Sequence, residues 1–277
     1  MTGGTVRRVS AEVRREQVRA RYGGIASRGG CCSSGDSSSD CCGGSAGRSS
    51  CGSSSVARQL GYSAKELSGL PDGANLGLGC GNPTALLALR PHQVVLDLGS
   101  GAGVDCFLAS KKVGPKGHVI GVDMTPEMVS KARENARKGG YSNVEFRLGE
   151  IEHLPVADGS VDVVVSNCVI NLAPDKGSVY REAFRVLRPG GRLAVSDVVA
   201  TRPISERDRA DPSLWSSCSS GALGVRRVRS LLRQAGFEQV ELDLKTPESA
   251  PGNLPDPATI GVVPADIRAT RPGAERR

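Results

Sequence analysis

The sequence predicts an α/β fold in which helices cover both faces of a mostly parallel, seven-stranded sheet. From residue 93 onward, short apolar runs alternate with segments of helical composition, which is typical of parallel strands joined by crossover helices. Glycine follows several of these helical segments, at the point where a helix should end. The chain of 277 residues is also long enough to bury a substantial core.

The predicted elements follow one another in a regular order. Strands are expected at residues 94–98, 118–122, 144–148, 161–166, 192–197, 237–244 and 264–270. Helices are expected at residues 103–112, 126–138, 176–187 and 225–235. No helix separates the last two strands, so we expect them to form an antiparallel pair at the edge of the sheet.

The N-terminal part of the chain has a different composition. A helix is predicted over residues 5–22, and Gly23 with Gly24 should end it. Residues 27–55 form a Gly/Ser-rich stretch that cannot bury enough apolar surface to become ordered by itself. A short helix is predicted at residues 63–70, where a serine followed three residues later by a glutamate fits a capping box.

These patterns divide the chain into five expected segments. They are an N-terminal helix with a mobile Cys/Gly/Ser-rich stretch at 1–60, a lid segment at 61–92, a ligand-binding core at 93–200, an insertion at 201–224, and a closing helix with strands at 225–277. Within the last segment, the proline-rich residues 248–262 should form a loop rather than a domain.

Charge and hydropathy narrow the possible functions. Of the formal net charge of +7, residues 1–28 carry +5 and residues 266–277 carry +2. Only 3% of the residues are aromatic, so the basic residues are not interleaved with stacking groups as in many nucleic-acid binders. No run of about eighteen apolar residues could span a bilayer, and the basic N-terminus lacks the apolar stretch of a secretory signal. We therefore expect a cytoplasmic protein that binds neither nucleic acid nor membrane.

The nine cysteines favour metal, metalloid or redox chemistry. An odd number of cysteines in a cytoplasmic chain argues against a structural disulfide framework, because that compartment keeps thiols reduced. Five of them lie in the Gly/Ser-rich stretch, at Cys31, Cys32, Cys41, Cys42 and Cys51. The other four are Cys80, Cys106, Cys168 and Cys218.

A glycine-rich turn follows the first predicted strand. Residues 94–103 read VVLDLGSGAG, a buried strand that runs into glycines and then into a helix. Such glycines let the backbone approach a ligand closely. The next strand ends at Asp123, where a carboxylate could accept hydrogen bonds from ribose hydroxyls. The spacing differs from the G-x-G-x-x-G of nicotinamide enzymes.

Three cysteines fall where the ligands of such a sheet bind. Cys168 follows the fourth strand, Cys80 precedes the first, and Cys218 lies in the insertion after the fifth. Three thiolates would suit a soft trivalent pnictogen and leave its lone pair free. Two other interpretations stay open. The cysteines could be small buried hydrophobic residues, as we expect for Cys106, or ligands of a zinc site, although the C-x₂-C spacing of structural zinc is missing.

The glycine turn resembles the first motif of class I methyltransferases, which have a Rossmann-like fold. The resemblance implies that S-adenosylmethionine binds there as methyl donor, with Gly99, Ser100 and Gly101 against its methionine end. It also implies that Asp123 binds the ribose and Met124 the adenine. The full implied set of cofactor-binding residues is Asp97, Gly99, Ser100, Gly101, Gly103, Asp123, Met124, Glu150, Ile151 and Asn167.

The sequence offers no clear general base for methyl transfer. A protonated acceptor usually needs one, whereas a soft atom with a free lone pair does not. His92, His118 and His153 stand beside strands or in a loop, and we interpret them as surface or structural residues.

Longer motifs resemble one family closely, the arsenite S-adenosylmethionine methyltransferases. The resemblance spans about residues 14–245 and includes VRARYG at 18–23, GANLGLGCGNP at 73–83, GEIE at 149–152 and SNCVINL at 166–172. The two motifs that contain cysteine are the most specific.

This resemblance implies roles for the cysteines and for partner molecules. Cys168 and Cys218 would be the core arsenic ligands, and Cys80 the third thiol, which an upstream cysteine of residues 27–55 would join in a disulfide during turnover. Arsenite or its thiol conjugates would be the acceptor and glutathione or thioredoxin the reductant, with no catalytic metal. The serines around Cys218 depart from the family pattern.

Two other functions fit part of the pattern. A quinone-type carbon methyltransferase would have the same cofactor turn, but it would leave the three cysteines without a role. A thiol-rich protein that binds a metalloid without turnover would not need the turn at Gly99 and Gly101 or the carboxylates of Asp97 and Asp123.

Overall fold

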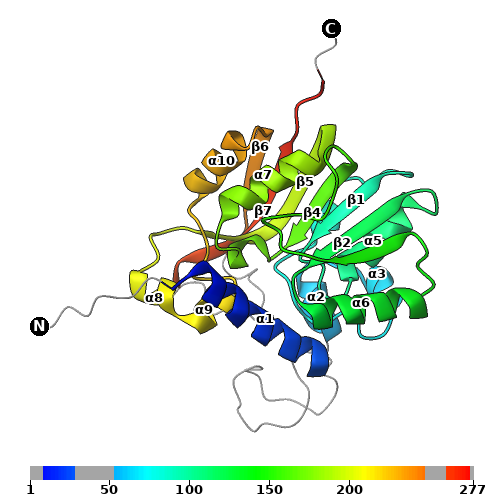
Figure 1. Ribbon diagram of the computed structural model, residues 1–277, viewed down its shortest axis with the longest axis horizontal. Helices are drawn as coiled ribbons and strands as arrows, with labels where there is room; N and C mark the ends of the chain where they lie inside the picture. The colour runs from blue at the N-terminus through cyan, green and yellow to red at the C-terminus, as the bar shows by residue number, and fades with distance from the viewer. Residues whose placement is uncertain (1–8, 29–52, 247–259, 275–277) are drawn as a thin grey trace, which may run out of the picture.

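The computed structural model describes residues 9–28, 53–246 and 260–274, and it confirms the α/β fold. Seven strands form one sheet in the order β3-β2-β1-β4-β5-β7-β6 (Figure 1). The strands are β1 (Val94–Leu98), β2 (His118–Asp123), β3 (Val144–Leu148), β4 (Val161–Asn167), β5 (Leu187–Ala200), β6 (Glu238–Leu244) and β7 (Val262–Thr270). All seven overlap the strands expected from the sequence.

The pairing of the strands is parallel from β3 through β5. β7 enters the sheet antiparallel to β5 and pairs with β6 on its other side. The expected antiparallel pair therefore exists, but only β6 forms the edge. β5 is longer than predicted because it begins at Leu187, directly after a helix, and extends to Ala200 along β7.

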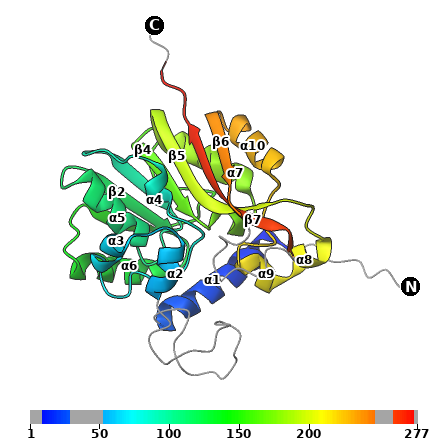
Figure 2. The same cartoon turned by 180° about the vertical axis from the view of Figure 1, so that it is seen from behind.

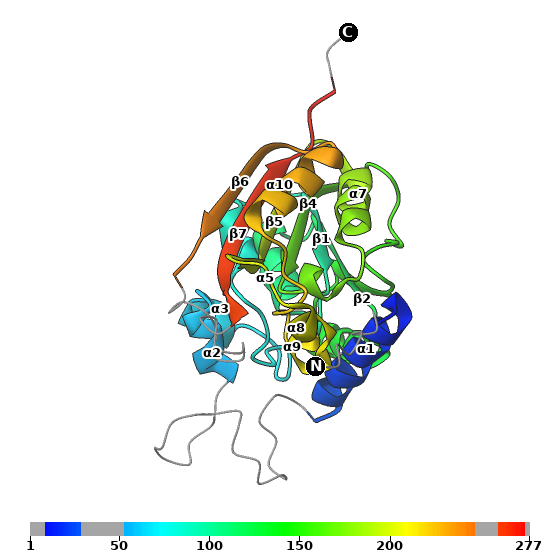
Figure 3. The same cartoon turned by 90° about the vertical axis from the view of Figure 1, so that its left-hand side faces the viewer.

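Four helices connect the strands, close to the predicted ranges. They are α5 (Val104–Val113), α6 (Pro126–Lys138), α7 (Lys176–Val186) and α10 (Val225–Gln234). Alternate residues of each strand face opposite helix layers. Leu96 and Leu98 of β1 pack with α7 residues such as Val179, whereas Val95 packs with Phe107 of α5 on the other face. Helices thus cover both faces of the sheet, as predicted (Figure 3).

The helix α1 (Ala11–Arg28) corrects the prediction that Gly23 and Gly24 end the first helix. Each glycine costs a helix about 1 kcal/mol relative to alanine. Burial of Ile25 and Ala26 in an apolar cluster with α6 offsets this cost. A Cβ on Gly23 would lie 3.1 Å from a carboxylate oxygen of Glu127, so the glycine also permits close approach to α6.

Several short helices were not predicted. They are α2 (Ser53–Gln59), α4 (Pro83–Leu86), the 3₁₀ helix η1 (Ile170–Leu172), α8 (Glu206–Ala210) and α9 (Pro212–Ser216), whereas α3 (Ala64–Ser68) lies where a short helix was expected. Cap residues mark three of them, because the side chains of Asn82, Ser205 and Asp211 accept hydrogen bonds from the first turn. Asn, Ser and Asp are also common in turns, so these residues alone do not predict such short helices.

The carboxyl ends of β1, β2 and β4 face a layer made by α1, α8 and α9 (Figure 2 and Figure 3). α1 packs against α6 at one end and against α9 and η1 towards the other. Segments that are far apart in the sequence therefore meet at the carboxyl ends of the strands, where the cofactor turn and Cys168 were predicted to lie. None of the helices in the described ranges is long and apolar enough to cross a membrane. The Pro-rich loop expected at 248–262 lies almost wholly outside the described residues.

Candidate active site

The turn after β1 has the backbone conformation that only glycine adopts easily. Gly99 has φ 68° and Gly101 has φ 51°. A Cβ on Gly99 would stand 2.4 Å from a methyl carbon of Val169, so this residue has no room for a side chain. A Cβ on Gly101 would meet no atom within 4 Å, which leaves an open cradle above the turn.

Asp123 is fixed at the end of β2 by two backbone groups. The N–H of Gly101 donates to one carboxylate oxygen and the N–H of Thr125 to the other, both at 2.9 Å. Burial raises the pKa of the Asp123 carboxyl, and these hydrogen bonds oppose the rise. The carboxylate is thereby tied to the glycine turn and oriented before any ligand binds.

A cavity of about 150 Å³ opens over these strand ends. Its wall includes most of the predicted cofactor residues, namely Asp97, Gly99, Ser100, Gly101, Asp123, Met124, Ile151 and Asn167, together with Cys168 and Cys218. The glycine cradle, the oriented carboxylate and the thioether of Met124 suit the methionine, ribose and adenine parts of S-adenosylmethionine. The residues present therefore fit this cofactor.

Two predicted cofactor residues do not line the cavity. Gly103 begins α5 with φ 102°, and a Cβ there would collide with the rings of Phe107 and Phe146. Glu150 pairs with Arg19 at 2.7 Å and with Arg15 at 3.1 Å. Close packing against the two phenylalanine rings explains why position 103 is a glycine. The ion pairs with two arginines of α1 explain why position 150 is a glutamate.

α1 covers the cavity with side chains that were not among the predicted site residues. Val18, Tyr22 and Ile25 line the wall from this helix. Arg15 holds the helix in place through a 3.2 Å ion pair with Glu152, a residue with only 5% of its surface exposed. The VRARYG motif at residues 18–23 belongs to α1, but its pattern does not indicate which part of the sheet this helix contacts.

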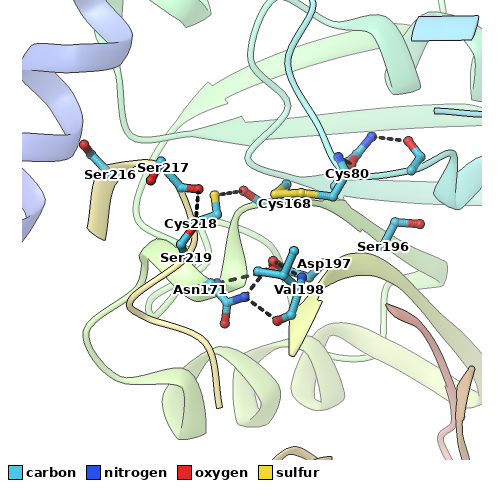
Figure 4. Close-up of a disulfide and its surroundings, with 12 residues drawn as sticks. Cys80, Cys168, Asn171, Ser196, Asp197, Val198, Ser216, Ser217, Cys218 and Ser219 are labelled. Carbon is cyan, nitrogen blue, oxygen red and sulfur yellow. Dashed lines mark hydrogen bonds between the residues drawn. A yellow bond between two sulfur atoms is a disulfide. The ribbon is translucent and has the colours of Figure 1, made fainter. Parts of the chain in front are cut away.

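The structure brings together the three predicted cysteines, Cys80, Cys168 and Cys218. Cys80 and Cys168 form a disulfide, with Cα atoms 5.4 Å apart (Figure 4). Cys218 Sγ donates a hydrogen bond to the carbonyl oxygen of Cys168 at 2.8 Å. All three residues are buried. The upstream cysteines that were expected to pair with Cys80 lie outside the described residues, so the partner seen here, Cys168, is one that was not predicted.

Both Cys168 and Cys218 have left-handed backbone conformations, with φ 56° and 63°. Such a conformation costs a residue other than glycine about 1 to 2 kcal/mol. The left-handed conformation turns the chain sharply after β4 and after α9. The segments that carry Cys168 and Cys218 meet at these two turns. Trp215 of α9 secures the second segment by donating from its indole nitrogen to Leu172 O at 3.1 Å.

A buried carboxylate that the sequence analysis did not identify stands beside the sulfurs. One oxygen of Asp197 and the sulfurs of Cys80 and Cys168 all lie within 4.8 Å of one another. The Asp197 carboxylate accepts hydrogen bonds from the side chain of Asn171 and the N–H of Val198, both at 2.8 Å. Burial raises the pKa of Asp197 to about 6. Burial, followed by the charge of Asp197, raises the pKa of the Cys218 thiol.

Cys106 lies apart from the cavity, as expected for a structural residue. It is fully buried on α5, and its Sγ donates to a carboxylate oxygen of Asp97 at 3.2 Å. His118 of β2 pairs with Glu145 of β3 at 3.1 Å. No histidine of the described residues lines the cavity.

Comparison with known proteins agrees with this geometry. A family profile described as "Methyltransferase domain" matches residues 89–236. The crystal structure of an arsenic(III) S-adenosylmethionine methyltransferase from Chlamydomonas reinhardtii superposes with a TM-score of 0.60 at 35% identity, covering 80% of this chain and 75% of that one. An arsenite methyltransferase from Halobacterium salinarum is 56% identical over 83% of this chain, and the human enzyme is 46% identical over 52%.

The fold and the cavity define a class I S-adenosylmethionine-dependent methyltransferase. Within that class, the chain belongs to the family of arsenic(III) S-adenosylmethionine methyltransferases. The matched region spans only 59% of the length of the Halobacterium relative and 40% of the human one.

Proposed function

We propose that this protein transfers methyl groups from S-adenosylmethionine to trivalent arsenic held by Cys80, Cys168 and Cys218, and that it detoxifies arsenic in the cytoplasm. One observation carries the proposal: three cysteines that are distant in sequence meet beside the cofactor cavity, and two of them, Cys168 and Cys218, line its wall. A quinone-type carbon acceptor would give these buried sulfurs no task.

Arsenic binding would begin with the reduced thiols. Each thiol that replaces a hydroxyl of arsenous acid forms an As–S bond and releases one water. Three such exchanges leave trivalent arsenic with its lone pair free. The Cys80–Cys168 disulfide has to be reduced first, because oxidised sulfur cannot bind arsenic. Glutathione or thioredoxin would supply the two electrons, and the cytoplasm keeps such thiols reduced.

The bound cofactor supplies an electrophilic methyl group on a sulfonium. The glycine turn and Asp123 hold it, and the cysteines hold arsenic on the adjacent wall, so the reacting atoms are brought together without a general base. Burial beneath α1 excludes water from the site. As the arsenic lone pair forms the As–C bond, the bond between the methyl carbon and the sulfonium sulfur breaks, S-adenosylhomocysteine is released, and arsenic becomes pentavalent. Cys80 and Cys168 can then leave arsenic together as the disulfide, which returns two electrons to it, while a cellular thiol loses a proton and binds arsenic in their place beside Cys218. Cellular thiols would then reduce the disulfide.

The test is a product analysis. Purified protein is incubated with S-adenosylmethionine, arsenite and excess glutathione, and arsenic species are separated by chromatography with element-specific detection. We expect methylated arsenic from the natural protein and from Cys106→Ser, which keeps a donor for Asp97, and none from Cys168→Ser. If the natural protein binds S-adenosylmethionine but yields no methylated arsenic, the proposal is wrong and a quinone-type acceptor is the next to test.

A second variant separates catalysis from mere binding. Asp123→Ala should lose S-adenosylmethionine binding and methyl transfer while still binding arsenite. Arsenite binding without any methyl transfer by the natural protein would instead support a non-catalytic metalloid-binding protein.

A further inference from the structure

Asn167, the last residue of β4, makes an unusual set of contacts with the loop that carries Cys80. Its side-chain oxygen accepts a hydrogen bond from the N–H of Cys80 at 2.8 Å. Its side-chain nitrogen donates to the carbonyl oxygen of Gly81 at 2.8 Å. The carboxamide of Asn167 thus holds the backbone on both sides of the Cys80 Cα. Asn167 and Cys80 are 87 positions apart in the sequence.

The loop is shaped to receive this side chain. Gly79 has φ 122°, and a Cβ there would stand 2.9 Å from both the oxygen and the nitrogen of the Asn167 carboxamide. Any other residue at position 79 would push the loop away from Asn167. The close approach of Asn167 therefore requires a glycine before Cys80.

A second layer of buried groups fixes the orientation of the carboxamide. Its nitrogen also lies 2.9 Å from the hydroxyl of Tyr62 and 3.2 Å from a carboxylate oxygen of Asp105. The Tyr62 hydroxyl in turn donates to the other oxygen of Asp105 at 2.8 Å. Because Asp105 belongs to α5, this network ties the Cys80 loop to the helix that starts at the cofactor turn. Tyr62 and Asp105 expose only 4% and 6% of their surfaces.

We propose that Asn167 is a positioning residue, which clamps residues 79–81 so that the sulfur of Cys80 faces the sulfur of Cys168. Asn167 and Cys168 are adjacent in sequence, so the clamp fixes the Cys80 loop relative to the residue next to its own reaction partner. Fixing two thiols in one geometry raises their effective concentration for each other. The consequence for arsenic rests on the proposed function, whereas the pairing of the two sulfurs can be measured without arsenic.

The sequence-based prediction for Asn167 was cofactor binding, and the residue does line the cavity. Its oxygen and its nitrogen, however, are both already bound to protein groups. The two roles make different predictions. A cofactor ligand affects the affinity for S-adenosylmethionine, and a clamp affects the equilibrium between the Cys80 and Cys168 thiols and their disulfide.

The experiment is a redox titration of the full chain in which the five cysteines of residues 31–51 are replaced by serine. Reduced protein is equilibrated with mixtures of glutathione and glutathione disulfide. Two protein thiols and one glutathione disulfide then give the protein disulfide and two glutathione molecules. Free thiols are trapped by alkylation, and the Cys80–Cys168 disulfide is quantified by mass spectrometry of peptides.

We expect Asn167→Ala to lower the equilibrium constant for disulfide formation about tenfold, which for a two-electron couple is a shift of about 30 mV. Tyr62→Phe keeps Asn167 but removes one partner, and we expect about a threefold decrease. The matched control is Asn143→Ala. Asn143 also joins two segments, through Ser110 and Gly114, but it lies at the far end of α5. It should leave the equilibrium constant unchanged.

Several outcomes would overturn the clamp. One is an equilibrium constant for folded Asn167→Ala within twofold of the parent, and another is an equal decrease in the Asn143→Ala control. Weaker binding of S-adenosylmethionine with an unchanged constant would assign Asn167 to the cofactor. If Asn167→Ala does not fold, the result for Tyr62→Phe decides: a decrease supports the clamp, and no change contradicts it. If the constants shift as expected but the protein methylates no arsenic, the proposed function fails and the clamp stands.

Discussion

The turns after β1 and β2 hold their groups through the backbone, whereas the three cysteines depend on side chains and on left-handed residues. On the cofactor side, Asp123 is fixed by the N–H groups of Gly101 and Thr125. On the thiol side, Cys80 is held by the side chain of Asn167, and Cys168 and Cys218 both have positive φ. The cofactor side is built from regular strand–turn–helix units. The thiol side is assembled from the loops between such units.

The two sides of the site should therefore respond differently to substitution. A backbone-built turn is sensitive to an added side chain, because Gly99 and Gly101 both have positive φ and Gly99 also has no space for a Cβ. The thiol side carries strain and buried charge, which costs stability and is retained for the geometry it gives the sulfurs. Three measurements of stability test this contrast between the two sides.

The largest expected effect is on the cofactor side, at Gly99. Gly99→Ala should lower the free energy of unfolding by about 3 kcal/mol, because a positive φ is combined with a collision with the β-branched side chain of Val169. Gly101→Ala has the same backbone strain but open space around the new methyl group, so its loss should be about 1 kcal/mol. Chemical denaturation of both variants measures the difference, and equal losses would refute the role assigned to Val169.

A smaller effect concerns buried charge on the thiol side. Lys176 lies under the Trp215 ring, 5.0 Å from its centroid, and burial lowers the pKa of its amine from 10.5 to about 8, helped by Arg209 and opposed by Asp197. Between these two values the unfolded chain binds more protons than the folded one, so stability should increase with pH in this window.

Lys176→Met should abolish this increase. For the natural protein we expect the free energy of unfolding to rise by about 2 kcal/mol between about pH 7.5 and 9.5 from this group, over and above other titrations that both proteins share. Denaturation of the two proteins at both pH values measures the difference. Parallel pH profiles would show that Lys176 is not held as a buried cation.

The smallest effect is expected away from both sides, at the capping box of α3. Ser63→Ala removes the side chain that accepts from the N–H of Glu66 and should cost about 1 kcal/mol, or a decrease in Tm of about 2 to 4 °C. Ser68→Ala, at the other end of the same helix, removes only an exposed contact and should change Tm less. Methyl transfer should be unchanged in both, and a loss of activity in Ser63→Ala would extend the site to this helix.

The regular half of the molecule could be predicted because local pattern and tertiary role agree there. Apolar strands, glycine turns and Asp123 occur in the order that is typical of a parallel sheet with crossover helices. The end of α1 could not be predicted correctly, since Gly23 and Gly24 disfavour a helix locally and the burial of Ile25 and Ala26, a tertiary effect, overrides them.

The thiol side could be predicted only in part. The position of Cys168 after β4 was evident from the strand pattern, and the roles proposed for Cys80 and Cys218 came from the resemblance to a family. The Cys80–Cys168 pairing, the carboxylate of Asp197 and the contacts of Asn167 depend on how distant loops meet. No periodicity encodes such contacts, because each joins residues tens of positions apart.

X-ray absorption at the arsenic edge can show whether three thiols of this protein bind trivalent arsenic. The protein, with its five cysteines at 31–51 replaced by serine, is reduced, loaded with one equivalent of arsenite and freed of small thiols. We predict three sulfur neighbours around arsenic, and two in the same protein carrying Cys218→Ser. Arsenic surrounded by oxygen alone, or an unchanged sulfur count in the Cys218→Ser protein, would contradict the account.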